Sequence, residues 1–432
     1  MRRQEAVSVA WLRRDLRLDD NRALSEAAAG GHAVLVLFIF DTDILDELDR
    51  DDHRLTFIHD TLSALHREFS AHGGGIRFGY GKPTDVFKAL TEQYDIKSVH
   101  AASDYEPYAR QRDKAVAEYL KTQHIPYQGH KDQVIFEKNE IVKQDGNPYT
   151  VFTPYKKQWL QRFRSGTLKD HSIDPGKIKW IRPENAIPTF TELGFRRSAK
   201  KVLPFDLSHL DKYEQQRNYP AIGCTSHLGP HLRFGTVSIR RIVSRMAGNA
   251  SFLSELIWRE FFMQILYHYP RAVYSNFKEK YNGIAWRNDE EEFMRWCRGR
   301  TGYPVVDAGM RQLNTTGYMH NRVRMITAGF LCKHLLIDWR WGEAYFARRL
   351  SDYELSSNNG NWQWAAGTGC DAAPYFRIFN PEEQLRRFDP EMEYVRRWIP
   401  EYGTDAYPEP VVDHRWARER ALGVYKKALN EK

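Results

Sequence analysis

The eight residues AVLVLFIF (Ala33–Phe40) form an unbroken apolar run near the start of a chain of 432 residues. The run is far too short to cross a membrane, which takes about 20 apolar residues in a helix. Its length and composition are typical of a strand that is buried within a sheet. Three further runs of this kind are SVAWL (Ser8–Leu12), GIRFGY (Gly75–Tyr80) and KSVHAA (Lys97–Ala102).

Amphipathic segments separate these predicted strands. In DDHRLTFIHDTLSALHREF (51–69), apolar residues recur at the helical spacing of i, i+3 and i+4. Strands that alternate with helices predict a doubly wound parallel α/β domain over residues 1–130. The dinucleotide fingerprint GxGxxG does not follow the first strand, and RRDLRLDDN (13–21) stands there instead.

The rest of the chain has a different character. Residues 131–196 are rich in Pro, Lys and Gly and show little sustained periodicity, so we interpret them as a long connector on the surface. Beyond them the strand signals cease, and long stretches have helical spacing with few breakers. These stretches are 254–269, 309–339 and 343–350. The predicted fold class is therefore α/β plus all-α, with a helical domain over residues 197–432.

The composition is that of a globular, basic protein. Hydrophobic residues make up 42% of the chain, which excludes global disorder. The net charge of +8 and the isoelectric point near 9.1 favour polyanions such as nucleic acid or acidic lipid. Aromatic residues reach 13%, and aromatic rings beside basic side chains suit unstacked bases. The bland alternative is that Trp simply fills a large core.

The cysteines indicate a reducing compartment. Cys224, Cys297, Cys332 and Cys370 are far apart and show neither a zinc spacing nor a disulfide framework. We therefore expect a reduced, cytoplasmic protein whose cysteines are buried as small apolar residues. The N-terminal stretch MRRQEAVSVAWLRRDLRL lacks the apolar region of a signal peptide, and no membrane segment is expected.

One stretch is unusual for an ordinary core. SSNNGNWQWAAGTGCDAAPYFRIFNP (356–381) places Asn358 and Asn359 directly before Trp362 and Trp364. Asparagine is a poor helix former that prefers caps and turns. Polar side chains beside large aromatic rings indicate a buried group that needs both a hydrogen bond and a stacking surface.

Two other motifs each leave two interpretations open. Thr225 and Ser226 precede an amphipathic run, where hydroxyl groups either cap a helix or hold a phosphate. Glu255, Trp258 and Arg259 fall within about one helical turn. They either line a cavity or form an exposed charged face beside a half-buried Trp.

The segment GYMHNRVRM (317–325) places His320, Asn321, Arg322 and Arg324 in the middle of a predicted long apolar helix. Buried guanidinium and amide groups need partners, so this density of polar groups favours a ligand site over core packing. Just before the unusual stretch stand Asp352 and Glu354. A carboxylate there either pairs with Arg324, accepts from a heterocycle N–H, or is a solvated loop charge.

Taken in order, these segments closely resemble the photolyase/cryptochrome family. The matching segments are WLRRDLRLDDN (11–21), YEQQR (213–217), TSHLGPHLRFG (225–235), ELIWREFF (255–262), GRTGYPVVDAGMRQL (299–313), GYMHNRVRM (317–325), LLIDWRWGEAYF (335–346) and NNGNWQWAAGTGCDAAPYFRIFNP (358–381). The resemblance covers nearly the whole chain. It implies an α/β antenna domain, a helical domain that holds FAD, and light-driven repair of ultraviolet-damaged DNA.

Within that family, the chain is most similar to the class I cyclobutane pyrimidine dimer photolyases. Relatives that repair (6-4) lesions carry a second His where Asn321 stands, and cryptochromes usually replace Asn358 with an acid or a cysteine. The chain departs from the family pattern at Gly229, Glu354 and Asn361. Competing hypotheses are a cryptochrome-like photoreceptor that signals through a partner and a flavin-independent nucleic-acid binder.

The resemblance assigns cofactor contacts. The residues expected to hold FAD are Tyr213, Thr225, Ser226, His227, Leu228, Gly229, Phe252, Arg259, Asn321, Arg324, Asp352, Tyr353, Glu354 and Asn358. Asn358 is expected to face flavin N5, because a neutral amide can accept the N5 hydrogen of a reduced flavin. A carboxylate at that position would alter the charge and protonation of the flavin.

The resemblance also assigns a lesion site and an electron route. The residues expected to contact DNA or the lesion are Arg217, Glu255, Trp258, Asn321, Arg322, Met325 and Trp364. Trp258 and Trp364 are expected to bracket a dimer that is flipped out of the stack. The residues expected to act in catalysis are Glu255, Asn321, Trp286, Trp339 and Trp362, and no metal is expected. The three catalytic tryptophans are expected to carry electrons from the surface to the flavin.

The resemblance implies one reduced FAD per chain and leaves the antenna chromophore open. Three alternatives are considered for the α/β domain: a folate, a deazaflavin, or no antenna chromophore. Glu106 in SDYEPYARQRD (103–113) is either an antenna contact or the salt-bridged start of a surface helix. The expected partner is ultraviolet-damaged DNA, without a membrane or an obligate protein partner. A monomer is expected in the cytoplasm of a bacterial-type cell, associated with the nucleoid when bound to DNA.

Overall fold

The structure is a computed structural model that describes residues 5–165 and 168–430, and the chain forms two compact units. The first unit combines the described parts of Met1–Glu140 and Trp159–Leu203 with Leu228–Gly248. The second combines Ile141–Gln158, Pro204–His227 and the described part of Asn249–Lys432. The two units thus interleave along the sequence. The predicted boundaries at residues 130 and 196 divide the chain in sequence order and stay a prediction.

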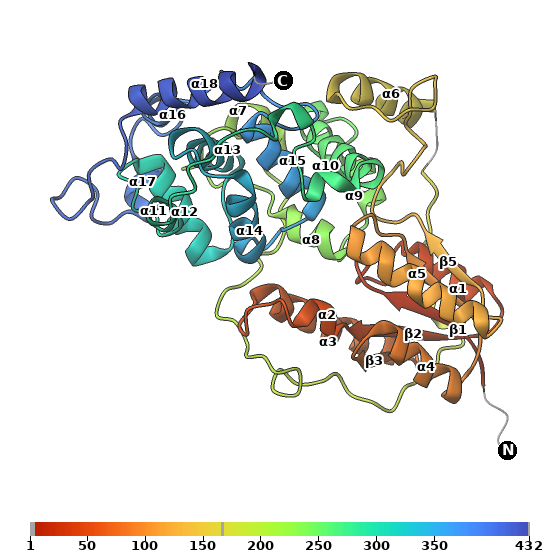
Figure 1. Ribbon diagram of the computed structural model, residues 1–432. Helices are drawn as coiled ribbons and strands as arrows, with labels where there is room; N and C mark the ends of the chain where they lie inside the picture. Colours follow the sequence, from red (N-terminus) through yellow and green to blue (C-terminus); the bar gives the residue numbers. More distant parts are fainter. Residues whose placement is uncertain (1–4, 166–167, 431–432) are drawn as a thin grey trace. The chain divides into compact units, whose positions relative to one another are not determined.

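The first unit contains a parallel sheet with the strand order β3-β2-β1-β4-β5 (Figure 1). Its strands are β1 (Ala6–Leu12), β2 (Ala33–Phe40), β3 (Ile76–Tyr80), β4 (Asp95–Ala102) and β5 (Tyr127–His130). The four strands predicted from apolar runs are all present. The sequence pattern does not predict β5, because YQGH is short, partly exposed and without an apolar run.

Helices cover both faces of this sheet. The helices of the first unit are α1 (Arg22–Ala29), α2 (Thr42–Leu45), α3 (His53–Ala71), α4 (Pro83–Gln93), α5 (Pro107–Thr122), α8 (Leu228–Phe234) and α9 (Ile239–Met246). Ala10 of β1 belongs to the same core as Leu24 of α1, whereas Val9 belongs to a second core with Phe87 of α4. Burial on both faces explains the continuous apolar strands and confirms the predicted doubly wound domain.

The predicted connector is not a structureless segment. It contains α6 (Phe152–Ser165), and the division between the two units falls within this helix, after Gln158. Part of the remainder pairs with the sheet, since Val34 N–H donates to Lys179 O at 2.8 Å. The sequence pattern does not indicate α6, because the helical spacing of Phe152, Tyr155 and Trp159 is short and lies between stretches rich in Pro and Gly.

The described part of the second unit is helical, as predicted. Its helices are α7 (Tyr213–Gln216), α10 (Ala250–His268), α11 (Glu290–Cys297), α12 (Pro304–Thr316), α13 (Asn321–Gly329), the π-helical turn η5 (Phe330–His334), α14 (Trp339–Arg349), α15 (Leu355–Ala366), α16 (Pro381–Phe388), α17 (Glu393–Trp398) and α18 (His414–Asn430). The single long helix predicted over 309–339 is wrong. Gly317 ends α12 with a φ of 77°, and His320 caps α13 by accepting from Arg322 N–H at 3.1 Å. The polar group at 320–324 therefore starts a helix and does not interrupt one.

The stretch with the paired asparagines is helical, although asparagine has a low intrinsic preference for helices. Asn358 and Asn359 lie inside α15, not in a cap or a turn. Asn359 Nδ2 donates to Ala272 O at 3.0 Å, and Gln363 Nε2 donates to the same carbonyl oxygen at 2.8 Å. Because each buried amide finds a partner, tertiary contacts outweigh the low helix propensity of asparagine.

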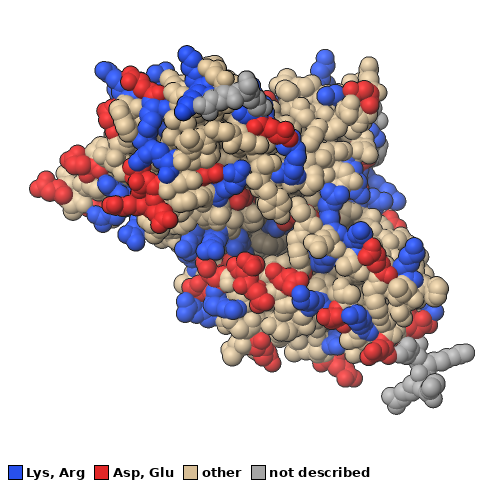
Figure 2. All heavy atoms as spheres, viewed as in Figure 1, with Lys and Arg blue, Asp and Glu red and all other residues tan. Residues whose placement is uncertain are grey.

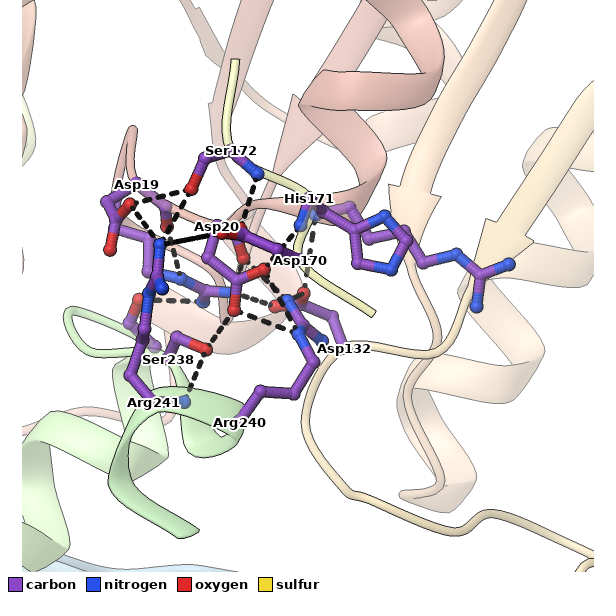
Figure 3. A network of polar contacts seen from close by, with 12 residues as sticks. Asp19, Asp20, Asp132, Asp170, His171, Ser172, Ser238, Arg240 and Arg241 are labelled. Atoms are coloured by element: carbon purple, nitrogen blue, oxygen red, sulfur yellow. Dashed lines mark hydrogen bonds and ion pairs between the residues drawn. The ribbon is translucent and has the colours of Figure 1, made fainter. Parts of the chain in front are cut away.

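Charged side chains are interspersed on the face drawn in Figure 2, where blue and red atoms alternate without one continuous basic field. A group of charged side chains is instead buried in the first unit (Figure 3). Arg240 contacts Asp20 and Asp132, each at 2.8 Å, and Arg17 contacts Asp132 at 2.6 Å. His171 N–H donates to Asp20 Oδ1 at 2.8 Å. The network thus joins the segments that follow β1 and β5, the chain near residue 171, and α9.

The ionised form of Asp132 contributes to the stability of the folded protein through this network. Burial by itself raises the pKa of Asp132, but the guanidinium groups of Arg17 and Arg240 outweigh it and hold that pKa below its ordinary value. A lowered folded pKa means that the stabilising contribution is present above the ordinary value of about 3.9. It is lost as the pH falls through the folded value.

We expect Asp132→Asn to lower the free energy of unfolding by about 3–5 kcal/mol at neutral pH, because a buried guanidinium loses its counter-ion. Urea unfolding followed by circular dichroism measures this. Asp170→Asn is the matched control: it removes a half-exposed partner of Arg241 at 3.2 Å and should cost less than about 1 kcal/mol. The difference between Asp132→Asn and the unchanged protein should shrink below about pH 4. Equal losses of unfolding free energy in the two variants would contradict a stabilising role for the buried ion pairs of Asp132.

Candidate functional site

The second unit contains a pocket of about 610 Å³, part of it open to solvent. Its walls come from α13, α14, α15 and the turn before α15. The lining residues are Asn321, Arg324, Met325, Ala328, Phe346, Leu350, Asp352, Tyr353, Glu354, Ser357, Asn358, Asn361, Trp362, Trp364 and Ala365. The sequence stretch with the paired asparagines therefore supplies one wall.

Two ion pairs hold the turn before α15. Arg324 contacts Asp352 at 2.9 Å, which is one of the three alternatives considered for this carboxylate, and its Nε–H donates to Met319 O at 2.8 Å. Arg259 of α10 contacts Glu354 at 2.9 Å. Glu354 is only 5% exposed, so it is not a solvated loop charge. Both charges of each pair are fixed before any ligand arrives, which keeps this wall rigid.

Asn358 and Asn359 are neighbours in sequence but contact different parts of the structure. Asn358 lines the pocket, and its Nδ2 donates to Glu343 O at 3.1 Å and to Glu343 Oε1 at 2.8 Å. Asn359 contacts Ala272 instead. Because the amide hydrogens of Asn358 are engaged, Oδ1 is left to accept a hydrogen bond, and no described residue donates to it. Burial raises the pKa of the Glu343 carboxyl, and the hydrogen bond from Asn358 lowers it only in part.

The pocket walls can hold a flat heterocycle. Phe346 and the nearly buried Trp362 supply apolar surface, and Asn358 Oδ1 supplies an acceptor. Apolar ring surface beside one neutral acceptor therefore fits an aromatic ligand with an N–H group at its edge.

The pocket gathers only part of the predicted site. From the predicted cofactor set it contains Asn321, Arg324, Asp352, Tyr353, Glu354 and Asn358, and from the lesion set it contains Asn321, Met325 and Trp364. The predicted residues outside its lining are Tyr213, Arg217, Thr225, Ser226, His227, Leu228, Gly229, Phe252, Glu255, Trp258, Arg259, Trp286, Arg322 and Trp339.

A second group forms where α7 meets α10. Arg217 contacts Glu255 at 2.7 Å, and its guanidinium lies 5.1 Å from the ring centre of Tyr213. Tyr213 in turn makes an edge contact with Phe252 at 5.2 Å. Burial, followed by the charge of Glu255, raises the pKa of Tyr213 to about 12. The group keeps a carboxylate and a guanidinium together near the surface. Close by in sequence, Asn218 accepts from Arg322 Nη2 at 2.6 Å.

Thr225, Ser226 and His227 end one segment of the second unit, whereas Leu228 and Gly229 begin α8 of the first. His227 has a φ of 49°, and its ring meets that of Tyr318 at 5.1 Å. Ser226 O accepts from Asp206 N–H at 2.9 Å. The helix-cap and phosphate interpretations of Thr225 and Ser226 both stay predictions.

Trp258 is half-buried on α10. Its ring lies face to face with that of Phe152, with centroids 3.6 Å apart and planes at 8°. The sequence did not indicate Phe152, because the contact joins the predicted connector to a distant helix. Trp364, the predicted counterpart of Trp258, lies on α15 in the pocket wall.

The three predicted electron carriers share one apolar core. Trp339 is 1% exposed, Trp362 is 2% exposed, and the partly buried Trp286 packs against the same cluster. Trp339 Nε1 donates to Asn276 Oδ1 at 2.9 Å. The ring of Trp362 lies against Gly342, where an added Cβ would come within 2.1 Å of it. Trp339 and Trp362 are therefore tightly held, and the role of all three indoles as electron carriers stays a prediction.

Glu106 forms ion pairs at the start of α5, with Arg233 at 2.5 Å and Arg14 at 3.4 Å. Of the two alternatives for Glu106, the structure shows the salt-bridged helix start. Its carboxylate, the group proposed for an antenna contact, is paired with these two arginines. Among the described residues, no group of three or more His, Cys, Asp or Glu side chains could hold a metal ion. None of the described helices is long and apolar enough to cross a membrane. Three of the free cysteines are buried, and Cys370 is partly exposed.

Comparison with known proteins agrees with this architecture. The family model described as DNA photolyase matches residues 8–175, and the model for the FAD binding domain of DNA photolyase matches residues 252–404. The deoxyribodipyrimidine photo-lyase of Halobacterium salinarum is 35% identical, over 98% of this chain and 100% of its own.

Two solved structures extend the comparison. The class III photolyase of Agrobacterium tumefaciens is 33% identical, with a TM-score of 0.82 over 98% of both chains. The cryptochrome of Synechocystis, 24% identical with a TM-score of 0.87 over 98% of this chain and 100% of its own, is similar in fold alone. Assignment to class I stays a prediction. From the matching models and the full-length relatives it follows that the chain belongs to the DNA photolyase family.

Proposed function

We propose that this protein splits cyclobutane pyrimidine dimers in DNA with light, as a deoxyribodipyrimidine photo-lyase. One observation carries the proposal: the segment matched by the FAD-binding model, 252–404, contains every residue that lines the pocket. Bound there, reduced FAD would supply the light absorption and the electron transfer that opens the cyclobutane ring. The protein supplies binding, orientation and exclusion of water.

The pocket residues orient the cofactor. Asn358 presents a neutral acceptor whose direction is set by Glu343, so it suits an N–H at the edge of a reduced flavin. The pairs Arg324–Asp352 and Arg259–Glu354 hold the turn that carries Tyr353. Tyr213 and the hydroxyl groups of Thr225 and Ser226 are proposed to hold the phosphate and ribityl part of FAD.

Other residues receive the lesion. A dimer must leave the base stack to meet the cofactor, and a damaged step costs less to extrude. Glu255 and Asn321 are proposed to bond the pyrimidine edges, and Met325 and Trp364 to pack beside them. Arg217 keeps Glu255 in place through their ion pair, while Arg217 and Arg322 contact the damaged strand. Trp258 offers an aromatic surface to the other side of the dimer.

The basic composition supports a DNA partner, and affinity should fall steeply with salt. We infer that the protein acts as a monomer in the cytoplasm, where the DNA of a bacterial-type cell lies. Whether a folate, a deazaflavin or no antenna accompanies the FAD stays open. With its carboxylate paired to Arg14 and Arg233, Glu106 gives no support to an antenna at that position.

The decisive test is repair itself. The chemically reduced protein is mixed with an oligonucleotide that carries one thymine dimer, then illuminated with blue light or kept dark. We expect dimer loss only in the light, measured by chromatography. Bound flavin without dimer loss would contradict the proposal and direct attention to Asn361, which departs from the family pattern beside the pocket.

We expect Glu343→Gln to retain FAD but to repair roughly 2- to 12-fold more slowly, the worth of one hydrogen bond. Gln can donate as well as accept, so the amide of Asn358 is no longer held in one orientation. In the unchanged protein, repair should also decline as the pH falls through the raised pKa of Glu343, since the protonated carboxyl can itself donate. The variant should lack this decline. Glu279→Gln, at an exposed ion pair, is the control, and equal behaviour of the two variants would contradict the role of Glu343.

Trp286→Phe should separate reduction of the cofactor from repair. Phenylalanine is much harder to oxidise than tryptophan, so reduction of oxidised flavin by light should be slower. Repair by protein that is already reduced should be unchanged. Absorbance during illumination measures the first and dimer loss the second. If both fall together, Trp286 is structural and not a carrier.

A further inference from the structure

Phe152 is the first residue of α6, and the proposed function assigns no role to it. Its ring covers Trp258 with centroids 3.6 Å apart and planes only 8° from parallel. Phe152 is 7% exposed, whereas Trp258 remains half-buried. One face of the indole is therefore permanently occupied by a side chain from outside α10.

The first turn of α6 is itself anchored. Asp371 Oδ2 accepts from Phe152 N–H at 2.9 Å. Lys156 donates to Ser254 Oγ at 3.0 Å, and the ring of Tyr155 packs on Phe261 at 5.2 Å. These contacts lie one turn before and one turn after Trp258 on α10. They hold Phe152 in place without any help from its own stacking contact.

A second ring restrains the same indole. Phe262, one turn further along α10, lies 5.4 Å from Trp258 with planes at 28°. Phe262 rests on α15 at Gly360, where an added Cβ would approach its ring to 2.2 Å. Gly360 stands two residues from Asn358 in the pocket wall. Trp258 thus contacts two rings, one anchored through α6 and one that lies against α15.

We propose that Phe152 is a positioning residue that holds Trp258 in the orientation needed to receive an extruded pyrimidine dimer. The inference rests on the proposed function. An indole free to rotate would lose that freedom when the lesion binds, and the loss would weaken binding. Stacking on Phe152 removes the freedom beforehand. Because Trp258 is proposed to contact the lesion and not the DNA backbone, Phe152 should affect selectivity for the lesion and not general DNA affinity.

The test uses the holoenzyme in the dark, with two oligonucleotides that differ only in one thymine dimer. We expect Phe152→Leu to weaken binding of the damaged oligonucleotide by about 2- to 12-fold, the range measured for an aromatic pair. Binding of the undamaged oligonucleotide should not change. Phe152→Tyr keeps the stacking and should keep the selectivity. Near-ultraviolet circular dichroism of the free protein should show loss of the ordered indole in Phe152→Leu only.

The same helix supplies a matched control. Phe163 of α6 stacks on Trp159 with centroids 5.0 Å apart and planes at 26°, so Phe163→Leu removes a similar contact outside the site. It should leave selectivity for the dimer unchanged. In a Trp258→Leu background, Phe152→Leu should have no further effect, because the side chain that it positions is already absent.

The inference is overturned if Phe152→Leu keeps full selectivity, or if it weakens damaged and undamaged binding equally, which is the behaviour of a purely structural residue. It is also overturned if Phe152→Leu still reduces selectivity in the Trp258→Leu background. A different result would reject the proposed function itself: an unchanged protein that does not prefer the damaged oligonucleotide. The two failures are therefore distinguishable.

Discussion

The helix α15 is buried over most of its circumference yet carries several amides, so each amide must find a partner inside the protein. An unsatisfied buried amide costs about 1–3 kcal/mol, and a helix with several of them would not be stable. Asn359 and Gln363 solve this by binding the carbonyl oxygen of Ala272 on one side. Asn358 binds Glu343 on the other. Satisfying the amides ties α15 to its neighbours, and the pocket is the space that remains.

The approach of α14 to α15 follows from the same requirement. Glu343 can reach Asn358 only because Gly342 leaves room for the ring of Trp362. Any side chain at Gly342 would push the helices apart and would break the contact that orients Asn358. A packing constraint and a hydrogen bond thus depend on one glycine. The acceptor of Asn358 and the buried indole of Trp362, both on α15, are consequently positioned together.

Buried polar groups also hold the first unit together, but these groups form ion pairs and not amide hydrogen bonds. Arg17, Asp20, Asp132 and Arg240 bring α9 to the sheet from more than a hundred residues away in sequence. A buried ionic network gains little net stability over an apolar core, but it tolerates few alternative arrangements. It therefore specifies which segments meet. In both units, buried polar groups decide the arrangement, and apolar burial supplies the driving force.

Much of this protein could be predicted from its sequence. Four strands follow from short apolar runs, and the helical second half follows from 3.6-residue spacing, because both patterns are local. The sequence offered the ion pair between Arg324 and Asp352 only as one of three alternatives, and the structure selects it. Family motifs then located Asn358 and Trp362, both of which line the pocket.

Other features were decided only by the tertiary structure. Helical asparagines in α15, the break at Gly317 and the sheet contacts of α9 depend on partners that no local pattern specifies. The stacking of Phe152 on Trp258 joins residues about a hundred positions apart, and spacing carries no information across that distance. The sequence thus determined which groups had to be buried and which chemistry they offered. Which partner satisfied each group was decided by folding, because hydrogen bonds and ring contacts depend on position in space and not on order along the chain.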